Sequence, residues 1–217
     1  MGTRVRRLLV ATTNLDKLTE IRQLLGTSPV DVLSLRDRPA VGEPHEAGTT
    51  FEENARLKAR YYDACLTSDP ADDRYTVAED SGLVIDALGG EPGIHSARFV
   101  SPDASYEQKF AEIYRRLAKT PQEGRTARFV CAVAVVHRGV VVFETTGTIE
   151  GEIAAEPRGS GGFGYDPIFY FPPYGMTLGE VSSDDKLRVA HRGVAIRQLA
   201  AWLEGDAPGR HMDEIGA

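Results

Sequence analysis

The sequence predicts an α/β fold in which the second half of the sheet is mostly antiparallel. Near the start, a short buried strand leads directly into an amphipathic helix, which is how α/β units begin. Two further helices follow, each with its own N-terminal signal, and residues 126–153 then form a long β-rich stretch. Because this stretch reads as neighbouring antiparallel strands, a simple doubly wound sheet is not expected.

The composition is that of an ordinary globular domain. The chain has 217 residues, of which 41% are hydrophobic and 26% charged, and its formal net charge is −7. The length fits one domain, which we expect to span residues 1–204, with residues 205–217 as a flexible C-terminal tail. The acidic balance argues against nucleic-acid binding, which needs a basic face, but it leaves room for a small anionic substrate.

Cysteine use and hydropathy bear on the compartment. The two cysteines, Cys65 and Cys131, lie far apart, so neither a disulfide framework nor a zinc site is indicated. No apolar stretch approaches the roughly 18 residues that a membrane span needs, and we expect no signal peptide. The sequence therefore predicts a cytoplasmic protein with reduced thiols and no membrane partner.

The first unit consists of a strand at residues 7–12 and the helix that follows it. This helix carries Leu18, Ile21 and Leu25 at helical spacing, and Asn14 is placed to cap its N-terminus. Free backbone N–H groups and the positive end of the helix dipole then face the segment between strand and helix.

The middle of the chain predicts further helices and two short strands. After a polar loop at residues 36–49, Thr50 and Glu53 form a capping box that opens a helix to about Cys65. A turn-rich linker, TSDPADDR, precedes two short strands, TVAE and LVIDAL, which flank an expected turn at residues 80–82. A second capping box, Ser105 with Gln108, opens the next helix.

The last part of the chain predicts a hairpin, a glycine-rich loop and a final helix. Residues 126–137 and 140–146 are joined by Arg138-Gly139, and GTIEGEI continues the sheet. The glycine loop RGSGGFGYDP is followed by a turn and the strand IFYF. The final helix is marked by apolar residues at helical spacing: Ile196, Leu199, Ala200 and Leu203.

The glycine loop lacks the features of a phosphate cradle. A P-loop ends in Gly-Lys-Ser or Gly-Lys-Thr, and a dinucleotide fingerprint runs into a helix, whereas Pro167 and a strand follow here. Two interpretations remain open. Phe163 and Tyr165 can form one wall of a pocket for a flat base, or the segment can be a tight turn with core aromatics.

The better candidate for phosphate binding is the segment from Thr12 to Lys17. It lies between the end of a strand and the start of a helix. Lys17 falls in the first helical turn, where the helix dipole disfavours a cation unless an anion is bound nearby. On the next helix, Asn54 and Lys58 are four residues apart and share one face. For both segments a simple solvated surface remains the alternative.

Adjacent carboxylates at Glu79 and Asp80 are the candidates for metal chemistry. Neighbouring residues of a strand point to opposite faces, so one of them is expected to enter a shared site, and Glu46 can supply a second oxygen ligand. Magnesium is commonly held by one or two carboxylates together with substrate phosphates. The alternative is ordinary turn chemistry at Asp-Ser-Gly.

Basic residues gather just before the final helix. Lys186, His191 and Arg192 can converge at the helix start, and a planar guanidinium can serve paired acceptors such as those of guanine. A solvated basic loop is the alternative.

Six motifs, in this order, resemble the inosine/xanthosine triphosphate pyrophosphatase family: ATTNLDK, TFEENARLKA, AEDSGL, LGGEPGIHSARF, GSGGFGYDPIF and DKLRVAHRG. The resemblance covers nearly the whole chain. It implies an elongated α/β fold with a mixed sheet and two lobes flanking a central substrate cleft. It also implies a homodimer that uses Mg²⁺ to cleave ITP, dITP or XTP into the monophosphate and pyrophosphate.

The resemblance also implies roles for single residues. Asp80 resembles the family's catalytic acid, which acts as metal ligand and proton acceptor, and Glu46 resembles its second metal ligand. The expected triphosphate contacts are Thr12, Thr13, Asn14, Lys17 and Lys58, and Ser81 would face the substrate. The expected base-binding residues are Phe163, Gly164, Tyr165, Asp166, Lys186, His191 and Arg192.

Three residues depart from the family pattern. Thr13 replaces a common glycine, Glu79 a common aspartate and Ala190 a common serine, which bears on substrate preference more than on activity. Two other functions stay open: a related pyrophosphatase for modified pyrimidine or methylated nucleotides, and a nucleotide sensor without turnover. The presence of both Glu46 and Asp80 disfavours the sensor.

Overall fold

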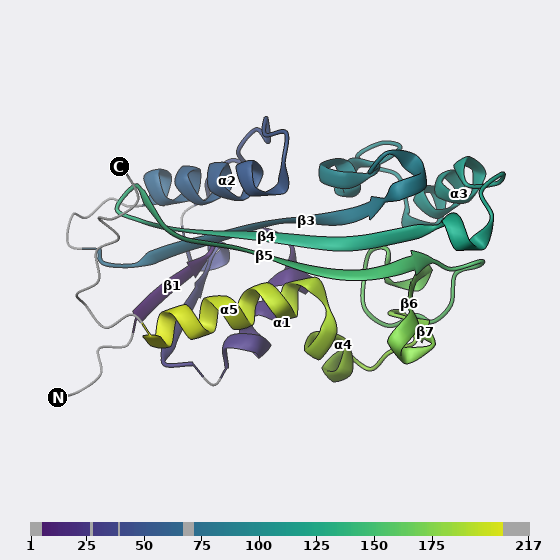
Figure 1. Cartoon of the computed structure of the whole chain (residues 1–217). Coiled ribbons are helices and arrows are strands. Elements are labelled where there is room, and N and C mark those ends of the chain that lie inside the picture. Colours follow the sequence, from purple (N-terminus) through teal and green to yellow (C-terminus); the bar gives the residue numbers. More distant parts are fainter. Residues whose placement is uncertain (1–5, 27, 39, 67–71, 206–217) are drawn as a thin grey trace, which may run out of the picture.

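A mixed seven-stranded sheet runs along the molecule in this computed structural model, which describes residues 6–26, 28–38, 40–66 and 72–205 (Figure 1). In spatial order the strands are β2 (Val30–Ser34), β1 (Arg6–Val10), β3 (Tyr75–Ile85), β4 (Thr126–His137), β5 (Val140–Ile153), β6 (Phe169–Phe171) and β7 (Met176–Thr177). Strand β1 pairs in parallel with β2 and β3, and the other neighbouring pairs are antiparallel. The predicted elongated mixed sheet is confirmed.

Helices cover both faces of the sheet. They are α1 (Leu15–Leu25), α2 (Phe51–Leu66), α3 (Tyr106–Arg116), α4 (Ser183–Val189) and α5 (His191–Gly205). Figure 1 shows α2 on one face of the long strands, α1 and α5 on the other, and α3 near the end where β6 and β7 lie. None of the described helices is long and apolar enough to cross a membrane.

The alternation of side chains along β4 explains why both faces are covered. Cys131, Val133 and Val135 pack with apolar residues of α1 and α5, whereas the even-numbered residues between them pack with α2. A third apolar cluster, built around Phe129, Ile153 and Phe169, fills the end of the molecule that carries α3. The extent of the domain, residues 1–204, stays a prediction.

Local signals placed most elements correctly. The Asn14 side chain accepts hydrogen bonds from the backbone N–H groups of Asp16 and Lys17 and so caps α1 as predicted. The capping box of Ser105 and Gln108 is present at α3. The hairpin at Arg138-Gly139 is confirmed, since both residues have positive φ, as a two-residue turn between twisted strands requires.

The predicted capping box of Thr50 and Glu53 is only half formed. Glu53 N–H donates to Thr50 Oγ1 at 3.2 Å, but the Glu53 carboxylate accepts from Thr49, not from the Thr50 backbone. Helix α2 nevertheless begins at Phe51 and ends at Leu66, one residue beyond the expected end. Most of the TSDPADDR linker and residues 206–217 of the predicted tail lie outside the described residues.

The expected turn at residues 80–82 is wrong. Residues 75–85 form one continuous strand, β3, which pairs with β4 from Thr76 to Ile85. Gly82 serves close packing here, because a Cβ atom on it would lie 2.4 Å from Gly93 O. Asp-Ser-Gly therefore lies in mid-strand, where pairing with a long partner overrides the local preference for a turn.

Candidate active site

The active-site candidates gather where β1 ends and β3 continues. Strand β1 pairs with β3 only as far as Val10 opposite Val77, and Ala11 N–H still donates to Val77 O at 2.8 Å. The two acids of β3 follow directly, so the loop between β1 and α1 lies beside them. As predicted for strand neighbours, Glu79 and Asp80 have partners on opposite faces.

Asp80 lies on the face covered by α2. Lys58 Nζ is 2.7 Å from Asp80 Oδ1 and 3.0 Å from Glu46 Oε1, and the fully buried Asn54 donates through Nδ2 to Asp80 Oδ2 at 3.2 Å. The four-residue spacing of Asn54 and Lys58 places both on the helix face that meets the strand. The predicted group of Glu46, Lys58 and Asp80 is thus assembled from three separate segments.

Helix α2 also holds the loop that carries Glu46. Gly48 N–H donates to Asn54 Oδ1 at 2.9 Å, and Thr49 N–H donates to the Glu53 carboxylate at 2.6 Å. A Cβ atom at Gly48 would lie 2.6 Å from the same Asn54 oxygen, so only glycine allows this close approach. Asn54 therefore positions both acids, Asp80 through its amide nitrogen and Glu46 through the loop.

The environment separates the proton affinities of the two acids. Burial raises the pKa of Asp80 above its usual value, and the Lys58 ammonium offsets this only in part. For Glu46, burial acts in the same direction, but Lys58 and Arg98 outweigh it and lower the pKa. Lys58 has two carboxylate partners, which raise its pKa despite burial. Asp80 is therefore the acid better suited to accept a proton.

Glu46 and Asp80 offer oxygen ligands of the kind that a divalent ion takes. The described part of the chain contains no group of three or more His, Cys, Asp or Glu side chains that could hold a metal ion by themselves. However, Glu46 and Asp80 both reach one cation, the Lys58 ammonium, so their oxygens converge on a single point. Two carboxylates completed by substrate phosphates match the way proteins commonly hold Mg²⁺.

Glu79 lies on the face covered by α1 and α5. Arg192 donates to both of its oxygens, Nε to Oε2 at 2.8 Å and Nη2 to Oε1 at 2.9 Å, and Lys17 Nζ is 2.9 Å from Oε1. The Cys131 thiol donates to Oε2 at 2.9 Å. Burial acts to raise the pKa of Glu79, but Arg192 and Lys17 hold it well below its usual value. This carboxylate is ionised and saturated with partners.

The predicted base-binding residues meet on this second face. Lys186 Nζ contacts Asp166 Oδ2 at 2.6 Å and Glu20 Oε1 at 2.9 Å. The other Glu20 oxygen accepts from Arg192 Nη1 at 2.6 Å. The Phe163 ring lies under both cations, with its centroid 4.7 Å from Lys186 Nζ and 5.4 Å from the Arg192 guanidinium carbon. The glycine loop and the final helices thus come together.

Two of the predicted base contacts, His191 and Tyr165, are buried and have their partners within the protein. His191 stacks on Phe129 with ring centroids 4.8 Å apart, and burial followed by Arg192 lowers its pKa well below the usual value. The Tyr165 side chain belongs to the core, and its hydroxyl donates to Ser96 O at 2.8 Å. The Tyr165 ring therefore packs in the core beneath the glycine loop. The aromatic ring that lies beside Lys186 and Arg192 is that of Phe163.

The remaining predicted residues lie in the loop after β1, in β3 and in the glycine loop. Thr12 Oγ1 accepts from Asn14 N–H at 3.2 Å, and Thr13 Oγ1 donates to Glu43 at 2.8 Å. Ser81 Oγ accepts from Arg192 Nη2 at 3.2 Å, on the Glu79 face. Gly164 has a φ of 69° within the glycine loop. Lys17 pairs with Glu79 and not with Asp80, so the predicted residues form two adjoining groups, one on each face of β3.

Sequence reasoning missed Glu20, Arg98 and the central place of Glu79. Glu20 follows Lys17 by three residues and so shares its helix face, which is a usable local signal. Arg98 lies in a motif, LGGEPGIHSARF, to which no role was given, and its Nη1 is 2.8 Å from Glu46 Oε2. That Glu79 binds Arg192, 113 residues away, had no local signal.

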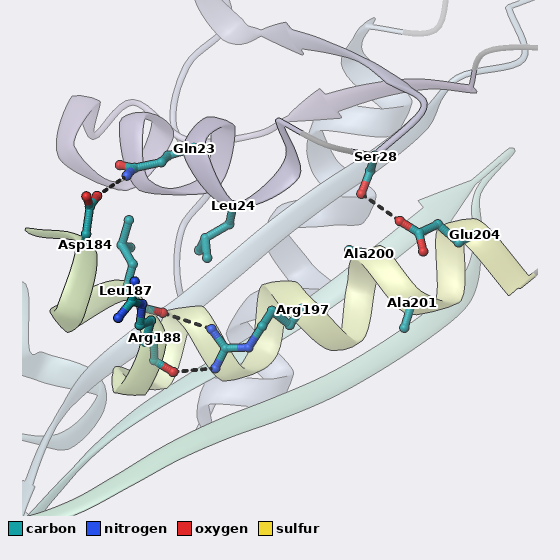
Figure 2. A pocket seen from close by; sticks show the side chains of 10 residues that line it. All are labelled: Gln23, Leu24, Ser28, Asp184, Leu187, Arg188, Arg197, Ala200, Ala201 and Glu204. Carbon is teal, nitrogen blue, oxygen red and sulfur yellow. Dashed lines mark hydrogen bonds between the residues drawn. The ribbon is translucent and has the colours of Figure 1, made fainter.

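A surface cavity of about 490 Å³ between α1, α4 and α5 is separate from this site (Figure 2). Its polar side chains already have partners: Gln23 bonds Asp184, Ser28 bonds Glu204, and Arg197 donates to backbone carbonyls of α4. It contains none of the residues predicted to bind substrate.

Comparisons with known proteins identify the family of this chain. The model of the Ham1 family matches residues 8–202. A dITP/XTP pyrophosphatase of Geobacillus kaustophilus is 42% identical over 210 residues, covering 97% of this chain and all of the relative, and one of Geobacter sulfurreducens is 44% identical over 197 residues, covering 91% and 96%. A HAM1 protein structure from Coxiella burnetii, 33% identical, superposes with a TM-score of 0.82 over 93% of this chain and all of that one. The chain therefore belongs to the Ham1 family.

Proposed function

We propose that this protein hydrolyses the non-standard purine nucleoside triphosphates ITP, dITP and XTP to the monophosphate and pyrophosphate, and so cleanses the nucleotide pool. The observation that carries the proposal is the pairing of two groups across β3. One group has two acids and a lysine suited to polyphosphate chemistry, and the other has an aromatic ring and two cations suited to a base. Relatives about 40% identical over nearly the whole chain carry the name dITP/XTP pyrophosphatase.

The polyphosphate would lie along the end of β1. Lys17, Lys58 and the positive end of the α1 dipole would hold its oxygens. Glu46 and Asp80 would hold Mg²⁺, which would neutralise phosphate charge. A water oxygen attacks the α-phosphorus, the bond to the bridging oxygen breaks, and pyrophosphate leaves. Asp80 would accept the proton of the water.

The base would be selected by donors. Arg192 and the main-chain N–H groups of the glycine loop offer donors to a 6-oxo purine, and the Phe163 ring offers a stacking face. A 6-amino group would meet donors and leave buried groups unpaired, at about 1–3 kcal/mol for each mismatch. Two mismatches correspond to about hundredfold or greater discrimination against ATP.

Pyrophosphate release across a nucleotide panel tests the proposal. We expect kcat/KM for ITP, dITP and XTP to exceed that for ATP by about a hundredfold, with turnover dependent on Mg²⁺. Equal efficiencies would remove the specificity claim. Preference for a modified pyrimidine or methylated nucleotide would instead identify the related enzyme, and tight ITP binding without pyrophosphate release would identify a sensor.

The resemblance to the family also supports a homodimer in the cytoplasm. Sedimentation equilibrium of the purified chain measures the oligomeric state, and fractionation of the source cells measures the compartment. A monomer at all concentrations would contradict the dimer.

A further inference from the structure

We propose that Arg98 binds the pyrophosphate portion of the substrate. The inference rests on the proposed function, since it names a further residue of the same polyphosphate site. Arg98 ends a short 3₁₀ helix, η3 (Gly93–Arg98), which comes from the one family motif left without a role.

Arg98 is the outer member of a row of alternating charges. Asp80 contacts Lys58 at 2.7 Å, Lys58 contacts Glu46 at 3.0 Å, and Arg98 Nη1 contacts the other Glu46 oxygen at 2.8 Å. Lys58 is 13% exposed, whereas the Arg98 side chain is 36% exposed. Its cation is therefore accessible to a ligand that approaches the two acids from solvent.

The guanidinium has donors to spare. Nη1 meets Glu46, and among the described residues Nε and Nη2 meet no protein acceptor. A phosphate presents several oxygens, which suits the planar fork of arginine better than a single carboxylate contact does. Arg98 can thus add bonds to a phosphate without first losing one to the protein.

The segment behind Arg98 is held firmly against β3. Ser96 Oγ accepts from Leu83 N–H at 2.9 Å and donates to Gly93 O at 2.6 Å, and Lys109 Nζ donates to Ala97 O at 2.7 Å. Gly82, two residues after Asp80, has no room for a Cβ atom against this segment. The backbone of Arg98 is therefore fixed relative to the catalytic acid, as a residue that positions a reacting group must be.

Charge balance indicates what the cation is for. The four groups of the row, two acids and two bases, sum to zero when no ligand is bound. A divalent ion held by Glu46 and Asp80 would compete with Lys58 and Arg98 for these carboxylates, and a polyphosphate would supply negative charge for the two bases. The row would then exchange partners without leaving an unpaired charge in a partly buried site.

Another arginine provides a matched control. Arg128 Nη1 is 2.8 Å from Asp86 Oδ1, so the two pairs have the same N–O distance, and both arginine side chains are 36% exposed, although Asp86 is more exposed than Glu46. Arg128 lies on β4 opposite Val84, four residues along β3 from Asp80, and contacts none of the site residues. Comparing substitutions of Arg98 and Arg128 therefore distinguishes the effect of losing a surface ion pair from the effect of losing a phosphate ligand.

The experiment compares Arg98→Gln, Arg98→Lys and Arg128→Gln. Binding of inorganic pyrophosphate is measured by calorimetry with and without Mg²⁺, together with KM, kcat and thermal unfolding. We expect Arg98→Gln to weaken pyrophosphate binding and raise KM by about tenfold or more, because a charge-assisted bond is lost. Arg98→Lys should recover part of the loss, and Arg128→Gln should match the unchanged protein.

Unchanged pyrophosphate binding in Arg98→Gln would overturn the inference and leave Arg98 as a structural ion-pair partner of Glu46. Equal losses in Arg98→Gln and Arg128→Gln would overturn it as well. The proposed function has a separate test, because it fails if the unchanged protein turns over no nucleotide of the panel. Even then, a tenfold loss of pyrophosphate binding in Arg98→Gln would support the phosphate site.

Discussion

Glu79 and Asp80 are neighbours in the chain, yet their surroundings differ in almost every respect. Glu79 receives donors from Arg192, Lys17 and Cys131, and its pKa is held well below the usual value. Asp80 receives one ammonium and one amide, and burial raises its pKa. These two neighbouring residues lie in different environments because successive side chains of a strand point to opposite faces of the sheet.

The contrast shows how two carboxylates acquire different tasks. A carboxylate saturated with cations has little affinity for a proton, so Glu79 is suited to hold Arg192 and Lys17 in place. A carboxylate with raised pKa and fewer donors is suited to proton transfer and metal binding, so Asp80 is suited to chemistry. Substitutions on the two faces should therefore separate activity from stability.

The largest effect is expected on the Asp80 face. Asp80→Asn keeps the size of the side chain and removes its charge, so kcat should fall by about 10²–10⁴-fold while nucleotide affinity changes little. Single-turnover kinetics and equilibrium nucleotide binding measure the two quantities. Full activity in this variant would remove Asp80 from the mechanism.

A matched control for this variant lies on α2. Asp63 is also buried and accepts from Thr76 and Gly139, away from the site, so Asp63→Asn should affect stability and leave kcat unchanged.

On the Glu79 face the main effect should be on stability. Glu79→Gln leaves the buried Arg192 without its bidentate partner, and we expect the free energy of unfolding to fall by about 3–5 kcal/mol. Denaturant unfolding measures this, with Asp86→Asn, which breaks an exposed pair, as a control expected to cost about 1 kcal/mol or less. A loss no larger than that of the control would contradict the comparison.

The same substitution should alter the acid sensitivity of the protein. The pKa of Glu79 is lower in the folded than in the unfolded state, so its contribution to stability is present above the ordinary value of 4.5 and is lost as the pH falls below it. Glu79→Gln has no such contribution to lose. The stability difference between the two proteins should therefore shrink between neutral pH and about pH 3.

The smallest effect is a displacement of the pH profile. Asn54→Asp replaces an amide donor 3.2 Å from Asp80 with a second carboxylate, which should raise the pKa of Asp80 further, by about one unit or more. Because a base acts only when deprotonated, the acid limb of kcat/KM should move to higher pH. An acid limb that stays in place would show that Asp80 is not the group that titrates.

Particular elements show where sequence reasoning succeeded. The Asn14 cap, the apolar spacing of Leu18, Ile21 and Leu25, and the turn at Arg138-Gly139 each depend on residues a few positions apart. Lys58 and Asp80, which lie in two of the quoted motifs, do meet Glu46 in the folded chain. Sequence reasoning failed at residues 80–82, where the local pattern indicates a turn but pairing with β4 continues the strand.

The sequence by itself determined four of the five helices, all but α4, together with the hairpin and the segments that carry acids and bases, because these signals are local and repeat with the period of the helix or strand. Only the tertiary structure decided which acid meets which base. Glu20 binds Arg192 across 172 residues, and Glu79 binds it across 113. Such pairs depend on strand pairing and on the packing of α1 and α5 on one face of the sheet and α2 on the other. The periodicity within one segment carries no information about which distant segment it will contact.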